Sequence, residues 1–318
     1  MEGFSLKIVF MGTSSFAVPS LKSLIESPYQ VVGIISQPDR PKGRGKKLSP
    51  PPVKKIAESH NLPVFQPKSI KDIAAVDQVK CWEPDLIIVV SYGQIIPSGI
   101  LDYPLYGCIN VHASLLPKYR GAAPIQRALM AGEKATGITT MFMDEGLDTG
   151  DIIMQRPVSI DNMVNHGELE TELAEIGAQL LMDTIEALNK KNITRKKQDN
   201  QRATYAHMLT REEEGIDWRE PAVAVHNKIR AMSPVPGAYF YADGMRVKVY
   251  KSRVYEEKGN GVISQVVDYT DDGFIVQTAD GLVEILEVQK EGKKRMLSRD
   301  FLKGFNLKPG TLLGIQGG

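Results

Sequence analysis

The sequence has few cysteines and no long hydrophobic run. Its two cysteines, Cys81 and Cys108, form neither a disulfide framework nor a metal-binding spacing, and both are expected to be small buried apolar residues. No apolar stretch is long enough to cross a bilayer, and Leu6–Phe10 is too short for a secretory signal. These absences favour a protein of the cytoplasm, or of an organelle matrix if a leader were missing, with no membrane partner.

An excess of charge of one sign is also missing. The formal net charge is +1, so the overall charge predicts no nucleic-acid partner, and only the distribution of the charges could indicate one. Hydrophobic residues at 42% and charged residues at 24% are typical of a globular protein with a sizeable core. A length of 318 residues suggests two domains.

Strands and helices alternate over the first two-thirds of the chain. Buried strands are predicted at Leu6–Met11, Val31–Ser36, Leu86–Val90 and Cys108–Val111, and a further strand pair at Ile138–Phe142 and Ile152–Ile160. Amphipathic helices are predicted at Phe16–Glu26, Pro52–His60, Ile70–Cys81 and Glu168–Leu188. This alternation predicts an α/β domain over residues 1–189, with a doubly wound, mostly parallel sheet.

The composition changes after residue 189. Residues 190–206 are polar and basic without apolar periodicity, which predicts a linker. Residues 207–318 begin with a short helix at Pro221–Met232 and continue with short strand-like runs separated by Asp-Gly turns, such as Asp243-Gly244. That pattern predicts a small C-terminal β-barrel or sandwich.

The turn after the first strand has a single glycine, Gly12. This is where a doubly wound fold binds anions or nucleotides, but the run lacks the G-x-G-x-x-G pattern. The sequence therefore argues against a dinucleotide site, and a simple strand-to-helix turn remains an alternative.

Asn110 and His112 stand two residues apart at the end of a predicted buried strand. Side chains with this spacing lie on the same face of a strand, and the carboxyl ends of parallel strands are where such sheets bind ligands. An amide beside an imidazole can polarise a carbonyl, stabilise an oxyanion and take part in proton transfer. A lone histidine at a strand end is more often structural, but the neighbouring amide and the following loop, rich in proline and glycine, favour a catalytic pair.

A short acidic loop runs from Asp144 to Asp151. Its glycines, Gly146 and Gly150, and its alternating acids predict a tight turn after a strand. A carboxylate here could orient His112, but the spacing alone does not show that Asp148 meets His112, and a solvated acidic turn remains the alternative. The other histidines, which have no partner motif, are expected to lie on solvated surface: His60, His166, His207 and His226.

Taken together, these motifs resemble the signature of the 10-formyltetrahydrofolate-dependent formyltransferases. The resemblance rests on Asn110-x-His112, the Ser-Leu-Leu-Pro run at 114–117 and Asp144-x-Gly146-x-Asp148-x-Gly150. It implies that Asn110, His112 and Asp148 form a catalytic triad that transfers a formyl group without a metal. It also implies a folate site made of Ser114, Leu115, Leu116, Pro117, Gln94, Ile95 and Asp144.

The resemblance extends to the tRNA-specific members of the family. The basic segment from Gln37 to Leu48, the run Arg120–Arg127 and the run Arg230–Gly237 are similar to those of methionyl-tRNA formyltransferases. This implies methionyl initiator tRNA as the formyl acceptor, tetrahydrofolate as the released product, an OB-like C-terminal barrel and a monomeric enzyme. The residues expected to contact methionine or tRNA are Phe16, Arg44, Lys46, Lys47, Lys293 and Lys294.

Several alternatives remain open. Related enzymes share this core but formylate glycinamide ribonucleotide or an amino sugar carried on a nucleotide. A non-catalytic RNA-binding protein on the same scaffold is a further possibility, against which the intact Asn110, His112 and Asp148 argue. Phe16 could be a helix-packing aromatic, and the basic segment could be a solvated surface loop.

Overall fold

The computed structural model describes residues 6–42, 47–255 and 259–314. The chain folds into two compact units. Unit 1 comprises residues 1–124, 135–159 and 170–206, and unit 2 comprises residues 125–134, 160–169 and 207–318. The predicted linker, residues 190–206, therefore belongs to unit 1, and two segments from within the predicted catalytic domain belong to unit 2.

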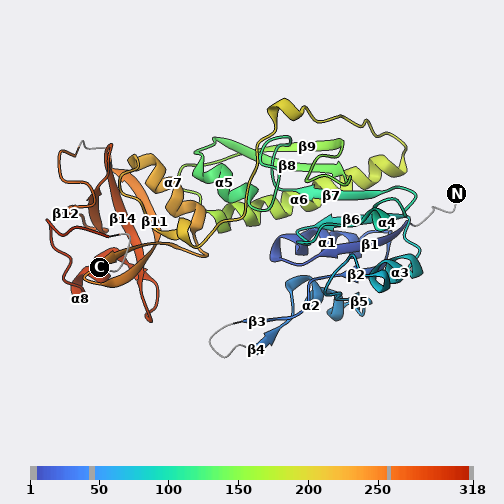
Figure 1. The fold of residues 1–318 in the computed structure, drawn as a ribbon, viewed down its shortest axis with the longest axis horizontal. Coiled ribbons are helices and arrows are strands. Elements are labelled where there is room, and N and C mark those ends of the chain that lie inside the picture. The colour runs from blue at the N-terminus through green and yellow to red at the C-terminus, as the bar shows by residue number, and fades with distance from the viewer. Residues whose placement is uncertain (1–5, 43–46, 256–258, 315–318) are drawn as a thin grey trace. The chain divides into compact units, whose positions relative to one another are not determined.

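Unit 1 is built on a seven-stranded sheet in the order β5-β2-β1-β6-β7-β8-β9 (Figure 1). The strands from β5 to β7 are parallel, whereas β8 is antiparallel to both of its neighbours. This order confirms the predicted doubly wound, mostly parallel sheet. The strands are β1 (Lys7–Gly12), β2 (Gln30–Ile35), β5 (Val64–Phe65), β6 (Leu86–Val90), β7 (Cys108–His112), β8 (Ala135–Phe142) and β9 (Ile152–Ser159).

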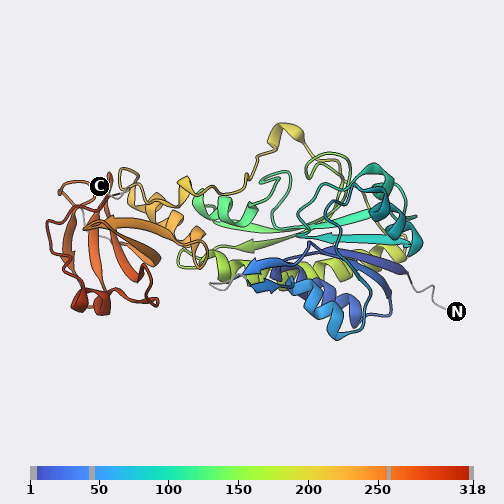
Figure 2. The ribbon, with the colours of Figure 1, turned by 60° about the horizontal axis from the view of Figure 1, so that its bottom comes forward.

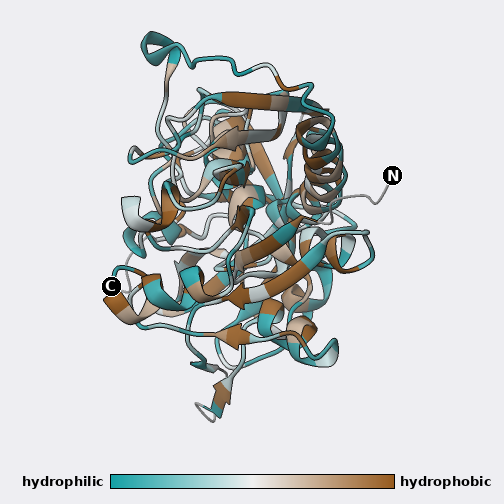
Figure 3. Cartoon of the chain, turned by 90° about the vertical axis from the view of Figure 1, so that its right-hand side faces the viewer, coloured by the Kyte–Doolittle hydropathy of each residue, from teal (hydrophilic) through white to brown (hydrophobic). Residues whose placement is uncertain are grey.

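Helices cover both faces of this sheet (Figure 2). Strand β6 is buried at every position, so it has no polar face. Brown, hydrophobic segments recur among the strands and helices of the chain in Figure 3. On one face, Val9 and Ile87 join an apolar cluster with residues of α3 and α4. The helical segments of unit 1 are η1 (Ser15–Ala17), α1 (Val18–Ile25), α2 (Pro52–Ser59), α3 (Ile73–Cys81), α4 (Ser98–Leu101), most of α6 (His166–Asn189) and η2 (Asn200–Arg202). Helix α5 (Pro124–Met130) belongs to unit 2 from Ile125 onward.

Local sequence explains where the helices begin. Helix α2 starts at Pro52, whose missing N–H costs nothing in the first turn. Ahead of α6, the Asn165 side chain accepts a hydrogen bond from the Glu168 N–H at 3.1 Å, and the Glu168 carboxylate accepts one from the Asn165 N–H at 2.9 Å. This capping box begins α6 two residues before the predicted start.

Two short strands lie within the basic segment from Gln37 to Leu48 and just beyond it. Strands β3 (Arg40–Lys42) and β4 (Lys47–Ser49) pair antiparallel, an element that the sequence analysis did not predict. Lys47 is exposed. Arg44 and Lys46, two of the predicted tRNA contacts, lie outside the described residues.

Unit 2 is an antiparallel sheet closed on itself. Its strands follow the order β10-β11-β14-β13-β12, with β15 also paired to β14. Gly314 exchanges two 2.8 Å hydrogen bonds with Tyr241 of β10, while Leu313 bonds Ser264 and Thr311 bonds Val266, next to and on β12. Residues 311–314 thus join the two outer strands, which confirms the predicted small barrel.

The barrel encloses an apolar core. Trp218, Phe240 and Phe274 are among the largest fully buried side chains, and helix α7 (Ala222–Met232) contributes Val225 and Ile229 to the same core. The other elements of unit 2 are η3 (Glu212–Glu214), β10 (Ala238–Ala242), β11 (Met245–Tyr255), β12 (Val266–Tyr269), β13 (Phe274–Gln277), β14 (Leu282–Lys290), β15 (Met296–Leu297) and α8 (Ser298–Gly304).

Candidate active site

Asn110 and His112 lie on strand β7, beside the parallel strand β6 and the antiparallel strand β8. Their side chains share a face, as the spacing predicted, and meet the carboxylate of Asp148 from the loop after β8. The Asn110 Nδ2 donates to Asp148 Oδ1 at 3.3 Å, and His112 Nδ1 lies 3.7 Å from Asp148 Oδ2. The structure therefore brings an amide, an imidazole and a carboxylate together at the carboxyl edge of the parallel sheet.

Asp148 is held by backbone groups as well as by side chains. The Gly121 N–H donates to its Oδ2 at 2.8 Å, and only 12% of its side chain is exposed. Its φ of +52° lies in the left-handed region that non-glycine residues seldom adopt. At Gly150 a Cβ would stand 1.8 Å from the Phe142 carbonyl oxygen, so only glycine fits this turn. The Asp148 end of the loop is thus fixed by the fold, whereas residues 144–147 are exposed to solvent.

The His112 ring contacts the protein through both nitrogens. Its Nε2 lies 3.0 Å from the carbonyl oxygen of Tyr119, and because a carbonyl only accepts, Nε2 carries the hydrogen in this arrangement. Its Nδ1 faces Asp148, and only 7% of the side chain is exposed. The ring is therefore held in a fixed orientation next to Asn110.

The Ser-Leu-Leu-Pro run is fastened to the neighbouring strands. Ser114 Oγ donates to the Lys118 carbonyl oxygen at 2.6 Å. Thr139 of β8 accepts from the Leu116 N–H and donates to the Ser114 carbonyl oxygen, at 3.2 and 2.6 Å. Leu116 is buried, Leu115 is half-buried, and the bond before Pro117 is cis. These contacts make residues 114–117 a rigid wall beside His112.

Three other predicted folate residues have different surroundings. Gln94 accepts from the Ile70 N–H at 2.8 Å and donates to the Lys68 carbonyl oxygen at 3.3 Å. Asp144 accepts from the Gly146 N–H and the Thr149 hydroxyl, at 3.0 and 2.6 Å, whereas Ile95 is 68% exposed. Gln94 and Asp144 shape their own loops, and Ile95 offers an exposed apolar surface.

Phe16 lies in η1, directly after the turn that follows β1, and is 7% exposed. In this turn the Thr13 hydroxyl donates to the Tyr92 carbonyl oxygen at 3.0 Å, which ties the ends of β1 and β6 together. Burial raises the pKa of Tyr92 to about 12, so its phenol stays neutral. The position of Phe16 suits both helix packing and contact with a substrate side chain.

The sequence analysis missed the contribution of residues 190–206 to this site. Gln198 donates from Nε2 to the carbonyl oxygens of Asp148 and Gly150, both at 2.8 Å. Gln198 Oε1 accepts from the buried Arg120 guanidinium at 3.1 and 2.8 Å. No local pattern signals such contacts, because a glutamine within a basic coil resembles any solvated residue.

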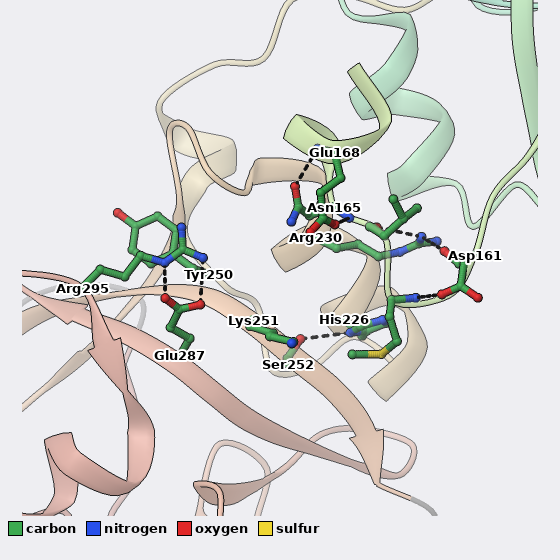
Figure 4. A pocket seen from close by; sticks show the side chains of 12 residues that line it. Asp161, Asn165, Glu168, His226, Arg230, Tyr250, Lys251, Ser252, Glu287 and Arg295 are labelled. Carbon is green, nitrogen blue, oxygen red and sulfur yellow. Dashed lines mark hydrogen bonds and ion pairs between the residues drawn. The ribbon is translucent and has the colours of Figure 1, made fainter. Parts of the chain in front are cut away.

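In unit 2, a cavity of about 410 Å³ is lined by polar side chains (Figure 4). His226 contacts Ser252 Oγ and the Asn162 carbonyl oxygen at 3.0 and 2.8 Å, and Arg230 donates to the carbonyl oxygens of Asp161 and Val164. His226 is buried, so the expectation of a solvated histidine was wrong there, and burial lowers its pKa. These groups fasten α7 to residues 161–164.

The predicted basic residues of unit 2 differ in their partners. Lys293 and Lys294 are exposed between β14 and β15, and within the described ranges neither forms an ion pair. Arg295 and Arg253, by contrast, pair with Glu287 and Glu284 on β14. Lys293 and Lys294 therefore carry exposed positive charge that no ion pair in the described part of the chain offsets.

Two further observations concern metals and membranes. Across the described residues, no group of three or more His, Cys, Asp or Glu side chains could hold a metal ion. No helix in that part of the chain is long and apolar enough to cross a membrane.

Comparison with known protein families identifies the family of the chain. Residues 6–185 match the family described as formyl transferase, and residues 208–306 match its C-terminal domain family. The chain belongs to the formyltransferase family.

Individual relatives are similar over their full length. The chain is 55% identical over 314 residues to the methionyl-tRNA formyltransferase of Syntrophomonas wolfei, covering 98% of this chain and 100% of that protein. It is 43% identical to that of Clostridioides difficile, covering 97% and 100%.

Solved structures share the fold. HypX from Aquifex aeolicus, crystallised with tetrahydrofolic acid, matches with a TM-score of 0.65 at 18% identity, covering 94% of this chain and 47% of that one. A methionyl-tRNA formyltransferase from Clostridium thermocellum matches with a TM-score of 0.54 at 21% identity, covering 80% and 95%.

Proposed function

We propose that this formyltransferase moves the formyl group of 10-formyltetrahydrofolate to the free amino group of methionyl initiator tRNA. The products are N-formylmethionyl-tRNA, which initiates translation, and tetrahydrofolate. The observation that carries the proposal is the 55% identity, over the whole of the Syntrophomonas protein, to a methionyl-tRNA formyltransferase. The convergence of Asn110, His112 and Asp148 supplies suitable chemistry.

The reaction requires groups that stabilise a developing oxyanion. The methionine amine attacks the formyl carbon, and the carbonyl oxygen becomes negative in the tetrahedral intermediate. Asn110 Nδ2 has a second N–H besides the one directed to Asp148, and this donor stabilises that oxygen. The His112 Nε2–H, whose partner in this structure is the Tyr119 carbonyl oxygen, exchanges that partner for the oxyanion when the substrate binds. The amine then loses its proton, the carbon–N10 bond breaks, and N10 of the leaving tetrahydrofolate takes a proton. Asp148 orients His112 and a water that relays the protons.

The remaining predicted residues have proposed roles in binding. Residues 114–117, with Gln94, Ile95 and Asp144, form the folate site, and Phe16 contacts the methionyl side chain. Arg44, Lys46 and Lys47 place the acceptor end of the tRNA, and Lys293 and Lys294 contact its backbone. We expect Arg44→Ala to reduce turnover on tRNA strongly. The proposed enzyme is a cytoplasmic monomer, and its mass in solution tests the oligomeric state.

A substrate comparison tests this function. The purified protein is assayed with 10-formyltetrahydrofolate and, in turn, methionyl initiator tRNA, glycinamide ribonucleotide and an amino sugar linked to a nucleotide. We expect efficient formylation of the tRNA alone. A higher kcat/KM on either small amine would replace the proposed acceptor, and tRNA binding without turnover on any amine would indicate a non-catalytic RNA-binding protein.

A further inference from the structure

The backbone of the Asp148 loop is held from a distant part of the chain. Gln198 stands in the coil after α6, fifty residues from Asp148 in sequence. Its amide nitrogen has two hydrogens, and each has an acceptor at 2.8 Å, the carbonyl oxygens of Asp148 and Gly150. A single side chain thus bridges the two ends of the turn that presents the carboxylate.

Arg120 fixes which way round the Gln198 amide points. Its Nε and Nη2 donate to Gln198 Oε1 at 3.1 and 2.8 Å, and Arg120 itself is 2% exposed. If the amide were turned over, its oxygen would face two carbonyl oxygens and its nitrogen would face the guanidinium donors. The amide therefore has one favourable orientation, and this is the one that holds the Asp148 loop.

The coil that carries Gln198 is itself fastened to the loop before α5. Arg120 N–H donates to the Thr204 carbonyl oxygen at 2.8 Å, and the Ala206 N–H donates to the Arg120 carbonyl oxygen at 2.7 Å. At Gly121, whose φ is +118°, a Cβ would lie 2.9 Å from the Ala206 carbonyl oxygen. Close approach of the two segments places the Gly121 N–H on the Asp148 carboxylate and Gln198 on the Asp148 backbone.

We propose that Gln198, oriented by Arg120, is a positioning residue that keeps Asp148 in its left-handed conformation with the carboxylate between Asn110 and His112. This inference rests on the proposed function, in which Asp148 orients His112. A carboxylate displaced by about 1 Å loses alignment with the ring, and displacements of that size reduce rates about a hundredfold. Substrate binding depends on other residues, so the loss falls on kcat.

Replacement of Gln198 by glutamate separates positioning from packing. Gln198→Glu keeps the shape and strengthens the contact with Arg120, but it removes both donors to the loop and places an anion against two carbonyl oxygens. A residue that only anchors the coil would tolerate this change. We expect kcat to fall about a hundredfold in Gln198→Glu, with the KM values and the unfolding temperature near those of the wild type.

Asn200→Ala is the matched control. Asn200 lies in the same coil, is exposed and accepts from Arg120 at 2.9 Å, but it does not touch the Asp148 loop. We expect near-normal turnover in this variant. Wild-type kcat in Gln198→Glu, or an equal loss in Asn200→Ala, would overturn the inference.

A double-mutant cycle with Asp148→Asn distinguishes this inference from the proposed function. If Gln198 acts through Asp148, the glutamate change adds little further loss in the Asp148→Asn background. A full additional loss would show that Gln198 acts elsewhere. If Asp148→Asn alone keeps wild-type turnover, the proposed role of Asp148 fails together with this inference. If Asp148→Asn is inactive while Gln198→Glu is normal, only this inference fails.

Discussion

The two units use charge in opposite ways. In unit 1 the Asp148 carboxylate is buried and accepts from an amide and a backbone N–H, so its charge is directed at the neighbouring His112. In unit 2 several arginines pair with glutamates, as Arg127 of α5 does with Glu213 of η3, whose pKa this contact lowers, and the exposed Lys293 and Lys294 remain for other partners. A fixed reaction centre needs buried, converging groups, whereas a surface for a polyanion needs accessible cations.

We expect the largest loss of activity when Asn110 or His112, two of the converging side chains of unit 1, is removed. His112→Ala and Asn110→Ala should each reduce kcat by roughly 10²–10³, because each removes a donor to the oxyanion. Single-turnover formylation of methionyl-tRNA, with the unfolding temperature as a control for folding, measures this loss. Near-normal turnover in purified His112→Ala would refute the catalytic assignment.

Removing only the charge of this centre should have a somewhat smaller effect. Asp148→Asn keeps the shape of the side chain but no longer places a negative charge beside His112 or supports the proton relay. We expect kcat to fall by about 10², within the range of proton-transfer contributions, while folate binding stays close to normal. Fluorescence titration with the folate and the steady-state rate measure the two quantities separately. Wild-type activity in Asp148→Asn would show that this loop has only a structural role.

Substitution of Phe16 distinguishes contact with the methionyl side chain from packing in the apolar core. Phe16→Ala should reduce the preference for methionine over other aminoacyl groups by about tenfold, since removing apolar contact of this size costs roughly 1–3 kcal/mol in selectivity. The ratio of kcat/KM values for tRNAs charged with methionine and with other amino acids measures it. A lower unfolding temperature with unchanged selectivity would make Phe16 a packing residue.

The smallest expected effect concerns the exposed cations of unit 2. The double variant Lys293→Ala, Lys294→Ala should weaken tRNA binding severalfold and reduce the slope of log affinity against log salt by about one unit per lost phosphate contact. Lys303→Ala is the control, because Lys303 is an exposed lysine already paired with Asp300. An unchanged salt slope in the double variant would leave the barrel without this RNA contact.

The sequence predicted the elements whose signals are local. The run Leu86–Val90 was predicted to be a buried strand and is observed as β6 with the same bounds. A short, continuous apolar run is typical of a strand that is buried on both faces. Period-two spacing placed Asn110 and His112 on a single face. The start of α3 was expected at Ile70 and lies at Ile73, because the backbone of the preceding residue, Asp72, is extended rather than helical.

The contacts that could not be predicted from the sequence are those between irregular segments. The approach of Asp148 to His112 depends on a turn with a positive φ and on the Gly121 N–H, neither of which leaves a periodic pattern. The coil around Gln198 lacks apolar periodicity because side-chain hydrogen bonds, rather than the burial of apolar side chains, hold it in place. The pairing of β3 with β4 was missed because each strand has only three residues and no period-two apolar pattern.

The closure of the barrel by residues 311–314 has a consequence for association between molecules. An open sheet presents rows of unpaired N–H and C=O groups at its margins, and these can recruit a strand from another chain. Here Gly314 occupies such groups on Tyr241, while Thr311 and Leu313 occupy those of Val266 and Ser264. These few residues of coil therefore keep the sheet edges from pairing with another chain. Shortening the chain to Gly310 would leave two sheet edges unpaired with the apolar core intact, and we expect that variant to aggregate through those edges.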